Sequence, residues 1–410
     1  MPIAEKIQSA LSASSMIRKM FEEGNQLKKQ HGADKVFDFS LGNPDVAPPP
    51  AFFEVLRKLA GEDKRGIHGY MPNAGFPHVR EAIAKKASAE HQVSIDGSHI
   101  VMAAGAAGGL NAVLKTICNP DDEVIVSRPY FMEYRFYAAN HGAKLVEVDA
   151  LPDFNLDIAA IGAVLSPKTA AVLINSPHNP TGRIYPAETI AALADMLREH
   201  GKKTGRPPYL VSDEPYREIT YNVDVPPLLC AYSETIIVNS YSKSLSLSGE
   251  RIGYIAVSPD MADKDDVLNG LIFATRTLGY VNAPAFMQRI VAELVESRVD
   301  VAVYARRRDA FAAILDEAGI EYAVPQGAFY LFCKVPSKKV PVPSKKAPTR
   351  KTDSKASDDL SFVSHLKQYL ILGVPGSGFG MPGWVRFAYC VGEETIRASA
   401  AALKQAMESW

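Results

Sequence analysis

Short apolar runs alternate with helix-length segments between about Ile100 and Ile255, and this alternation constrains the fold most strongly. The runs Glu123–Ser127, Ala170–Ile174 and Thr235–Asn239 are short, nearly continuous and rich in branched residues, which is typical of strands buried on both faces. Strands alternating with helices predict an α/β fold, with a mostly parallel sheet covered by helices on both faces. Because such sheets bind ligands in the loops that follow their strands, we expect functional residues there.

Composition narrows the class of protein. A chain of 410 residues predicts two or three structural units, and a net charge of -1 argues against a partner such as nucleic acid. No apolar run approaches the ~20 residues that span a bilayer, and Met1–Met20 lacks the apolar segment of a signal peptide. The four cysteines show no CxxC spacing, so we expect reduced thiols, no metal site, no membrane partner and a cytoplasmic protein.

Lys243 follows the apolar run Thr235–Asn239 and is surrounded by hydroxyl residues, including Ser240 and Ser242. An amine becomes a nucleophile toward a carbonyl when its surroundings favour the neutral form. Eight residues later, Arg251 adds a fixed positive charge. Together these groups could hold an aldehyde and a phosphate, the two groups that pyridoxal 5'-phosphate carries. The alternative is a surface lysine in a serine-rich loop.

The stretch from Ser240 to Gly253, SYSKSLSLSGERIG, resembles the lysine signature of the class I/II aminotransferases, which are fold-type I pyridoxal phosphate enzymes similar to aspartate aminotransferase. The resemblance extends over nearly the whole chain. It implies a large domain with a mostly parallel seven-stranded-type sheet, and a smaller α+β domain built from the N- and C-terminal segments. We expect an N-terminal segment and part of the small domain in 1–45, the large cofactor-binding domain in 46–290, and the small domain in 291–410. A Lys-, Pro- and Ser-rich flexible insertion is expected at about 336–359.

Two further strand ends carry polar motifs. The loop Asn179-Pro-Thr-Gly resembles the family loop that places an asparagine on the phenolic oxygen of the cofactor. Asp213, at the end of another strand, could pair with a protonated pyridine nitrogen, and Tyr216 could hydrogen-bond the phenolic oxygen. Glu214 and His178 are alternatives as charged or acid–base groups. The family spacing favours Asp213, and the family tolerates variation at the position of His178.

The cofactor's phosphate and ring also have candidate contacts. Gly105, Ala106 and Ala107 lie where a strand passes into a helix, and their small side chains let backbone N–H groups approach an anion. Close helix packing would explain the same residues. The resemblance implies that Phe131 stacks on the pyridine ring, a role that suits a flat apolar side chain. Tyr130 is the alternative.

Substrate contacts follow from the same resemblance. The backbone of Gly42 is expected near the substrate carboxylate, which Arg386 would hold with its planar fork, together with Asn179. A structural salt bridge is the alternative for Arg386. Tyr70 would cross the interface of a homodimer to the partner's cofactor, so that the active sites are shared. Arg276 lies near the family arginine that binds a distal carboxylate, but its spacing is not a clean match.

The sequence therefore predicts a homodimeric pyridoxal phosphate-dependent aminotransferase that moves an amino group between an L-amino acid and a 2-oxo acid. Lys243 would shuttle the substrate proton, with Asp213 and Tyr216 as the other catalytic residues. General similarity favours aspartate or glutamate, in amino acid metabolism and biosynthesis. The alternatives are an aromatic or neutral amino acid aminotransferase, a β-eliminating lyase on the same fold, and a cofactor-binding module without activity.

Overall fold

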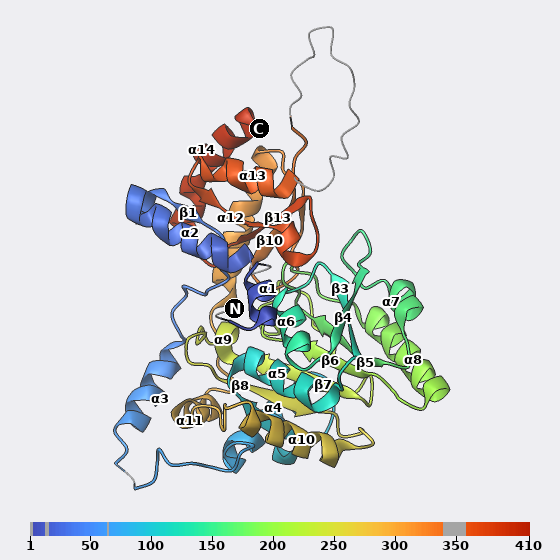
Figure 1. Ribbon diagram of the computed structural model, residues 1–410. Coiled ribbons are helices and arrows are strands. Elements are labelled where there is room, and N and C mark those ends of the chain that lie inside the picture. The colour runs from blue at the N-terminus through green and yellow to red at the C-terminus, as the bar shows by residue number, and fades with distance from the viewer. Residues whose placement is uncertain (1–2, 13–15, 64, 339–357) are drawn as a thin grey trace.

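A seven-stranded sheet forms the centre of the protein, in the order β2-β8-β7-β6-β5-β3-β4 (Figure 1). The structure is a computed structural model that describes residues 3–12, 16–63, 65–338 and 358–410. The strands are β2 (Ile100–Ala103), β3 (Glu123–Arg128), β4 (Lys144–Asp149), β5 (Thr169–Asn175), β6 (Tyr209–Asp213), β7 (Thr235–Ser240) and β8 (Gly253–Val257). Only β8 runs antiparallel to its neighbours, and the other pairs are parallel. The prediction of an α/β fold with a mostly parallel sheet is confirmed.

Helices cover both faces of this sheet, and together they form the large lobe. In β8, Tyr254 and Ala256 face one core, whereas Ile255 and Val257 face the other. The first core includes side chains of α3 (Pro50–Ala60), α4 (Pro77–His91), α7 (Ile158–Val164), α8 (Ala187–Thr204) and α11 (Ala285–Glu293). The second includes α5 (Gly105–Ile117), α6 (Glu133–Asn140) and α10 (Lys264–Thr277). Burial on both faces explains why the strands are continuously apolar.

A second, α+β lobe packs above the large one. Its antiparallel sheet has the order β12-β13-β10-β9, and β1 pairs with β11 in a separate parallel ribbon. The bounds are β1 (Phe37–Asp38), β9 (Tyr322–Ala323), β10 (Tyr330–Lys334), β11 (Ile371–Leu372), β12 (Val374–Pro375), β13 (Trp384–Ala388), α2 (Met16–His31), α12 (Val301–Glu317), α13 (Asp358–Lys367) and α14 (Glu393–Ser409). Figure 1 shows the N-terminal segment, in blue, beside the red C-terminal elements. This small lobe therefore joins the two ends of the chain, as predicted, although the exact domain limits stay a prediction.

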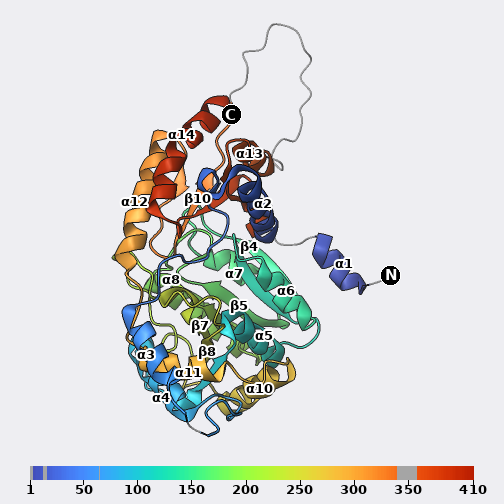
Figure 2. The same ribbon diagram turned by 90° about the vertical axis from the view of Figure 1, so that its left-hand side faces the viewer.

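The described part of the N-terminal segment contains the helices α1 (Glu5–Ser12) and α2. Figure 2 shows α1 extending away from the small lobe. Most of the expected insertion at 336–359 falls on 339–357, which lie outside the described residues. Within the described residues, no helix combines the length and apolar composition needed to cross a membrane.

Candidate active site

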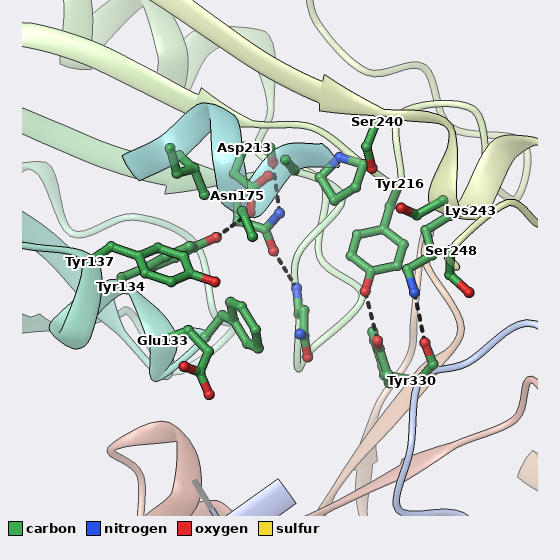
Figure 3. Close-up of a pocket in the computed structure, with 18 of the residues that line it drawn as sticks. Glu133, Tyr134, Tyr137, Asn175, Asp213, Tyr216, Ser240, Lys243, Ser248 and Tyr330 are labelled. Carbon is green, nitrogen blue, oxygen red and sulfur yellow. Dashed lines mark hydrogen bonds between the residues drawn. The ribbon is translucent and has the colours of Figure 1, made fainter. Parts of the chain in front are cut away.

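A cavity of about 430 Å³ lies at the carboxyl ends of the central strands, where the small lobe meets the sheet (Figure 3). It is lined by most of the predicted site residues: Gly42, Ala106, Ala107, Phe131, Asn179, Asp213, Tyr216, Ser240, Ser242, Lys243, Arg251 and Arg386. These residues come from strands, helices and loops that are far apart in the sequence. The strand ends bring them together, as expected for an open α/β sheet.

Lys243 lies on the short helix α9 (Tyr241–Ser244), directly after β7. Its Nζ atom donates a hydrogen bond of 2.7 Å to the carbonyl oxygen of Gly42 (Figure 3). Burial lowers the pKa of Lys243 to about 8, and the positive charges of Arg386 and Arg251 act in the same direction. At pH 7 about one tenth of this amine is therefore unprotonated and able to attack a carbonyl, far more than for an exposed lysine.

Asp213 ends β6, and its two carboxylate oxygens have different surroundings. Tyr134 donates a hydrogen bond of 2.7 Å to Oδ2, whereas the buried Oδ1 has no hydrogen-bond partner among the described residues. Burial raises the pKa of Asp213 to about 7, against the effect of the Tyr134 hydrogen bond. The alternative carboxylate, Glu214, accepts hydrogen bonds from Ser212 and Arg217 and does not line the cavity. Asp213 is thus the carboxylate that can accept a cation from the cavity.

Arg386 lies on β13 and is only 1% exposed. Its Nη1 atom donates to Asn179 Oδ1 at 3.0 Å and its Nη2 atom to the carbonyl oxygen of Ser40 at 2.6 Å. The guanidinium carbon is 4.4 Å from the ring centroid of Tyr330 and 4.8 Å from that of Phe379. No carboxylate of the described residues pairs with it, so the predicted alternative of a structural salt bridge finds no partner there. A buried, rigidly held arginine of this kind suits an anionic ligand.

The opposite end of the cavity collects anion-binding groups. Helix α5 begins at Gly105, whose φ of +73° favours glycine, and a Cβ there would overlap the guanidinium group of Arg251. The first turn of a helix leaves backbone N–H groups without intrahelical partners. Further donors come from residues that line this end of the cavity: Ala106, Ala107, Ser240 and Ser242. Such a set suits a phosphate group.

Comparison with known proteins agrees with this geometry. The model of the family described as "Aminotransferase class I and II" matches residues 34–403. The chain belongs to this family. Among its relatives, the aspartate/prephenate aminotransferase of Thermus thermophilus is 30% identical, over 91% of this chain and 90% of the relative. The probable aspartate aminotransferase of Methanocaldococcus jannaschii is 28% identical, over 90% and 93% of the two chains.

Solved structures give the same family. An aminotransferase from Eubacterium rectale superposes with a TM-score of 0.91 and is 34% identical, covering 100% of this chain and 99% of the other. Aspartate aminotransferase from Thermus thermophilus, in a structure with maleate, gives a TM-score of 0.83 at 26% identity, covering 98% and 99%. The predicted family and transaminase activity are therefore confirmed, as is the dependence of such enzymes on pyridoxal phosphate.

The residues of this aminotransferase fit its cofactor. Asp213 presents an unpartnered, buried oxygen to a ring cation, and Lys243 presents an amine of lowered pKa to an aldehyde. The N-terminus of α5 is kept open by Gly105 beside the guanidinium of Arg251. Each observation matches one chemical group of pyridoxal phosphate.

The structure shows where the candidates Phe131, Tyr130 and His178 lie relative to the cavity. Phe131 lines the cavity and meets the ring of Tyr134 edge to face, with centroids 5.6 Å apart. Tyr130 does not line the cavity and donates to Glu147 Oε1 at 2.9 Å. His178 also lies outside the lining; burial lowers its pKa to about 3, so it stays neutral. The geometry favours Phe131 over Tyr130 as the ring contact.

Tyr70 and Arg276 are not brought into the cavity of their own chain. The side chain of Tyr70 is 94% exposed, and the guanidinium carbon of the exposed Arg276 lies 5.3 Å from the ring centroid of Phe273 on α10. Their predicted contacts with a partner's cofactor and a distal carboxylate stay predictions. Among the residues that the structure describes, no group of three or more His, Cys, Asp and Glu could hold a metal ion.

The sequence interpretation missed several lining residues: Leu41, Leu110, Glu133, Tyr134, Tyr137, Asn175, Pro215, Ser248 and Tyr330. Asn175 connects two predicted residues, because its Nδ2 donates to the backbone carbonyl of Asp213 and its Oδ1 accepts from the N–H of Asn179, both at 2.7 Å (Figure 3). The sequence could have indicated Asn175, because it is a polar residue at the end of a buried apolar strand. Tyr330 carried no such signal, because it sits in an aromatic run typical of a core.

Proposed function

We propose that Lys243 binds the cofactor and moves the substrate proton in a transamination between an L-amino acid and a 2-oxo acid. One observation carries the proposal: a half-buried lysine with a pKa of about 8 lies in the same cavity as Asp213, which has one unpaired oxygen, and Arg386, which has no carboxylate partner among the described residues. Pyridoxal phosphate supplies the electron sink for the bond cleaved at the substrate's α-carbon. The neutral Lys243 amine then takes the α-proton and returns it as a general acid.

The other cavity residues have supporting roles in this proposal. Arg386 holds the substrate's α-carboxylate with N–H groups of its guanidinium fork, with help from the backbone near Gly42. Asn179 and the backbone carbonyl of Ser40 orient this fork. Fixing the carboxylate fixes the α-carbon and aligns its C–H bond for proton removal. Asp213 stabilises a protonated ring nitrogen, and Tyr216 donates to the phenolic oxygen.

We propose that the remaining cavity groups bind the phosphate and the ring. The α5 N-terminus at Gly105, Ala106 and Ala107 would hold the phosphate with Ser240, Ser242 and Arg251, and Phe131 would lie against the ring. We further propose a cytoplasmic homodimer in which Tyr70 reaches the partner's phosphate. The high exposure of Tyr70 in one chain supports this arrangement.

We propose aspartate or glutamate as the amino donor, because several relatives are named aspartate aminotransferases. An aromatic or neutral donor is the second candidate, favoured by one observation. The cations that line the cavity are Lys243, Arg251 and Arg386, and each already has a role in the proposal. Arg276 lies outside, and apolar walls such as Leu41 and Tyr137 remain for the side chain.

An absorbance spectrum of the purified enzyme, before and after single amino acids are added without an oxo acid, tests the function. Conversion of the visible band to that of the amine form of the cofactor by aspartate or glutamate supports the first donor class. Conversion by phenylalanine or alanine alone supports the second. A persistent band with accumulating ammonia and pyruvate would identify a lyase, and a protein that shows no band with added cofactor would contradict the role of Lys243.

A further inference from the structure

Two buried tyrosine hydroxyls meet in the cavity. The hydroxyl oxygens of Tyr216 and Tyr330 are 2.7 Å apart, and Figure 3 shows this contact beside Lys243. Tyr216 follows β6 of the large lobe, whereas Tyr330 begins β10 of the small lobe, so the bond crosses between the lobes. Burial raises the pKa of Tyr330 to about 12 and that of Tyr216 well above its usual value, so both hydroxyls keep their protons.

The number of hydrogens limits what this pair can do. Two phenolic hydroxyls supply two hydrogens, and the bond between them uses one. Among the described residues, neither hydroxyl has a further hydrogen-bond partner. The second hydrogen therefore points into the cavity, and the question is which tyrosine supplies it.

The surroundings of Tyr330 favour it as the donor within the pair. The guanidinium carbon of Arg386 lies 4.4 Å from the centroid of its ring, and after burial this cation has the largest effect on the pKa of Tyr330, which it lowers. At Tyr216 the same lowering effect of Arg386 is outweighed by burial and by the neighbouring phenol, so Tyr330 is the more acidic donor. The β10–β13 register places Arg386 opposite Phe332, two residues from Tyr330 and therefore on the same face of the sheet. A Cβ at Gly42 would overlap the Tyr330 hydroxyl, so the backbone there fixes its position.

We propose that Tyr330 is a positioning residue whose hydroxyl donates to the Tyr216 oxygen and thereby turns the Tyr216 O–H toward the cofactor's phenolic oxygen. The inference rests on the role proposed for Tyr216. Hydrogen bonds in a chain polarise one another, so Tyr216 becomes a stronger donor than it would be alone. Tyr330 thus acts through Tyr216 and not on the substrate.

The pH dependence of the visible absorption band of the cofactor-loaded enzyme tests this inference. A donor to the phenolic oxygen stabilises its anionic form, so loss of the donor raises the pH midpoint of the band. Tyr216→Phe should raise the midpoint most. Tyr330→Phe should raise it in the same direction by about half a pH unit, the equivalent of a weakened neutral hydrogen bond. Because phenylalanine keeps the ring and its stacking on Arg386, thermal unfolding should change little.

A double variant and a matched control complete the test. Since Tyr330 acts through Tyr216, the variant that carries both Tyr216→Phe and Tyr330→Phe should have the midpoint of Tyr216→Phe alone. Tyr389→Phe is the control, because Tyr389 is a buried tyrosine whose hydroxyl lies 3.1 Å from that of Tyr221, in the same lobe but outside the cavity lining. Its midpoint should equal that of the unaltered enzyme.

Two outcomes would overturn the inference. If Tyr216→Phe moves the midpoint but Tyr330→Phe leaves it unchanged, Tyr330 does not orient Tyr216. If the shifts of the two variants add in full, Tyr330 acts independently and the proposed chain is wrong. An unchanged midpoint in Tyr216→Phe itself would instead contradict the cofactor contact proposed for Tyr216, which separates failure of that role from failure of the inference.

Discussion

Asp213 and Glu214 are neighbours at the end of β6, but their carboxylates lie in opposite surroundings. Asp213 faces the cavity and has one hydrogen bond, from Tyr134, with its Oδ1 unpaired. Glu214 faces the interior, where the Ser212 hydroxyl donates to one oxygen and Arg217 Nη1 to the other. Both side chains are buried. Both carboxylate oxygens of Glu214, on the interior side of β6, therefore have hydrogen-bond partners within the chain. On the cavity side, Oδ1 of Asp213 has none among the described residues.

Arg386 and Arg217, which are both buried, differ in the same way. Arg217 Nη1 pairs with Glu214 at 3.0 Å, and its Nη2 donates to the carbonyl oxygen of Glu90 at 2.8 Å. Arg386 donates only to neutral oxygens, and its buried Nε has no partner among the described residues. Burying an uncompensated charge is costly, so such a group is expected where a ligand completes it. In both comparisons, the less completely paired side chain is the one that lines the cavity.

The largest expected effect comes from comparing Lys243, which lines the cavity, with Lys86, which does not. Lys243→Ala should reduce transamination by at least about 10⁴-fold and abolish the band of the lysine-bound cofactor, since the nucleophile and the proton carrier are lost together. Lys86, whose Nζ lies 2.8 Å from Glu218 Oε1, is the interior control. Lys86→Ala should keep turnover within a few-fold of the unaltered enzyme, and its main effect should be on the free energy of unfolding. Steady-state assays and spectra measure both, and an active Lys243→Ala enzyme would remove the basis of the comparison.

The arginines should separate activity from stability. Arg386→Leu is expected to lower kcat/KM by roughly 10²-fold or more, because charge-assisted hydrogen bonds to the substrate carboxylate are lost. Its unfolding free energy should stay close to that of the unaltered protein. Arg217→Leu leaves Glu214 without its cation and should destabilise the protein by about 3–5 kcal/mol. Chemical denaturation and kinetics distinguish the two variants, and similar losses of stability in both would show that Arg386 is structural.

Burial raises the pKa of both carboxyl groups, but substitution of the two residues should change stability at pH 8 with opposite signs. In the cofactor-free protein, the folded-state pKa of Asp213 is about 7, above its unfolded value, so the folded state binds the extra proton. This extra proton contributes its whole stabilisation of the folded state below about pH 4. As the pH rises toward 7, the free energy of unfolding falls by about 1.4 kcal/mol per pH unit.

Asp213→Asn removes this dependence, so the variant should be more stable than the unaltered protein at pH 8 by a few kcal/mol. The difference should disappear near pH 4. Glu214→Gln should instead be less stable at pH 8, because Arg217 loses its carboxylate. Unfolding curves at several pH values measure the change in unfolding free energy for both variants. If both variants are stabilised, or both destabilised, at pH 8, the proposed difference between Asp213 and Glu214 is wrong.

The sequence predicted the sheet and most of the cavity because both depend on local patterns. Continuous apolar runs predicted β3, β5 and β7, and the residues around Lys243 predicted its role, whereas the resemblance to the family supplied Asn179 and the spacing that favours Asp213. Tyr330 could not be found in this way. Its hydroxyl matters because the small lobe packs on the large one, and its neighbours Phe329 and Leu331 are ordinary core residues. Contacts between lobes depend on tertiary packing, which no local pattern encodes.

The choice between Phe131 and Tyr130 also depends on tertiary packing. Substitution of these two residues should have the smallest effect of the variants compared. Phe131→Leu removes an aromatic wall of the cavity and should weaken cofactor affinity by up to about tenfold, since aromatic contacts add ~0.5–1.5 kcal/mol beyond burial. Tyr130→Phe removes only the interior hydrogen bond to Glu147 and should leave cofactor affinity unchanged. Titration of cofactor-free protein with pyridoxal phosphate measures both. The reverse result would place the ring contact on Tyr130 instead of Phe131.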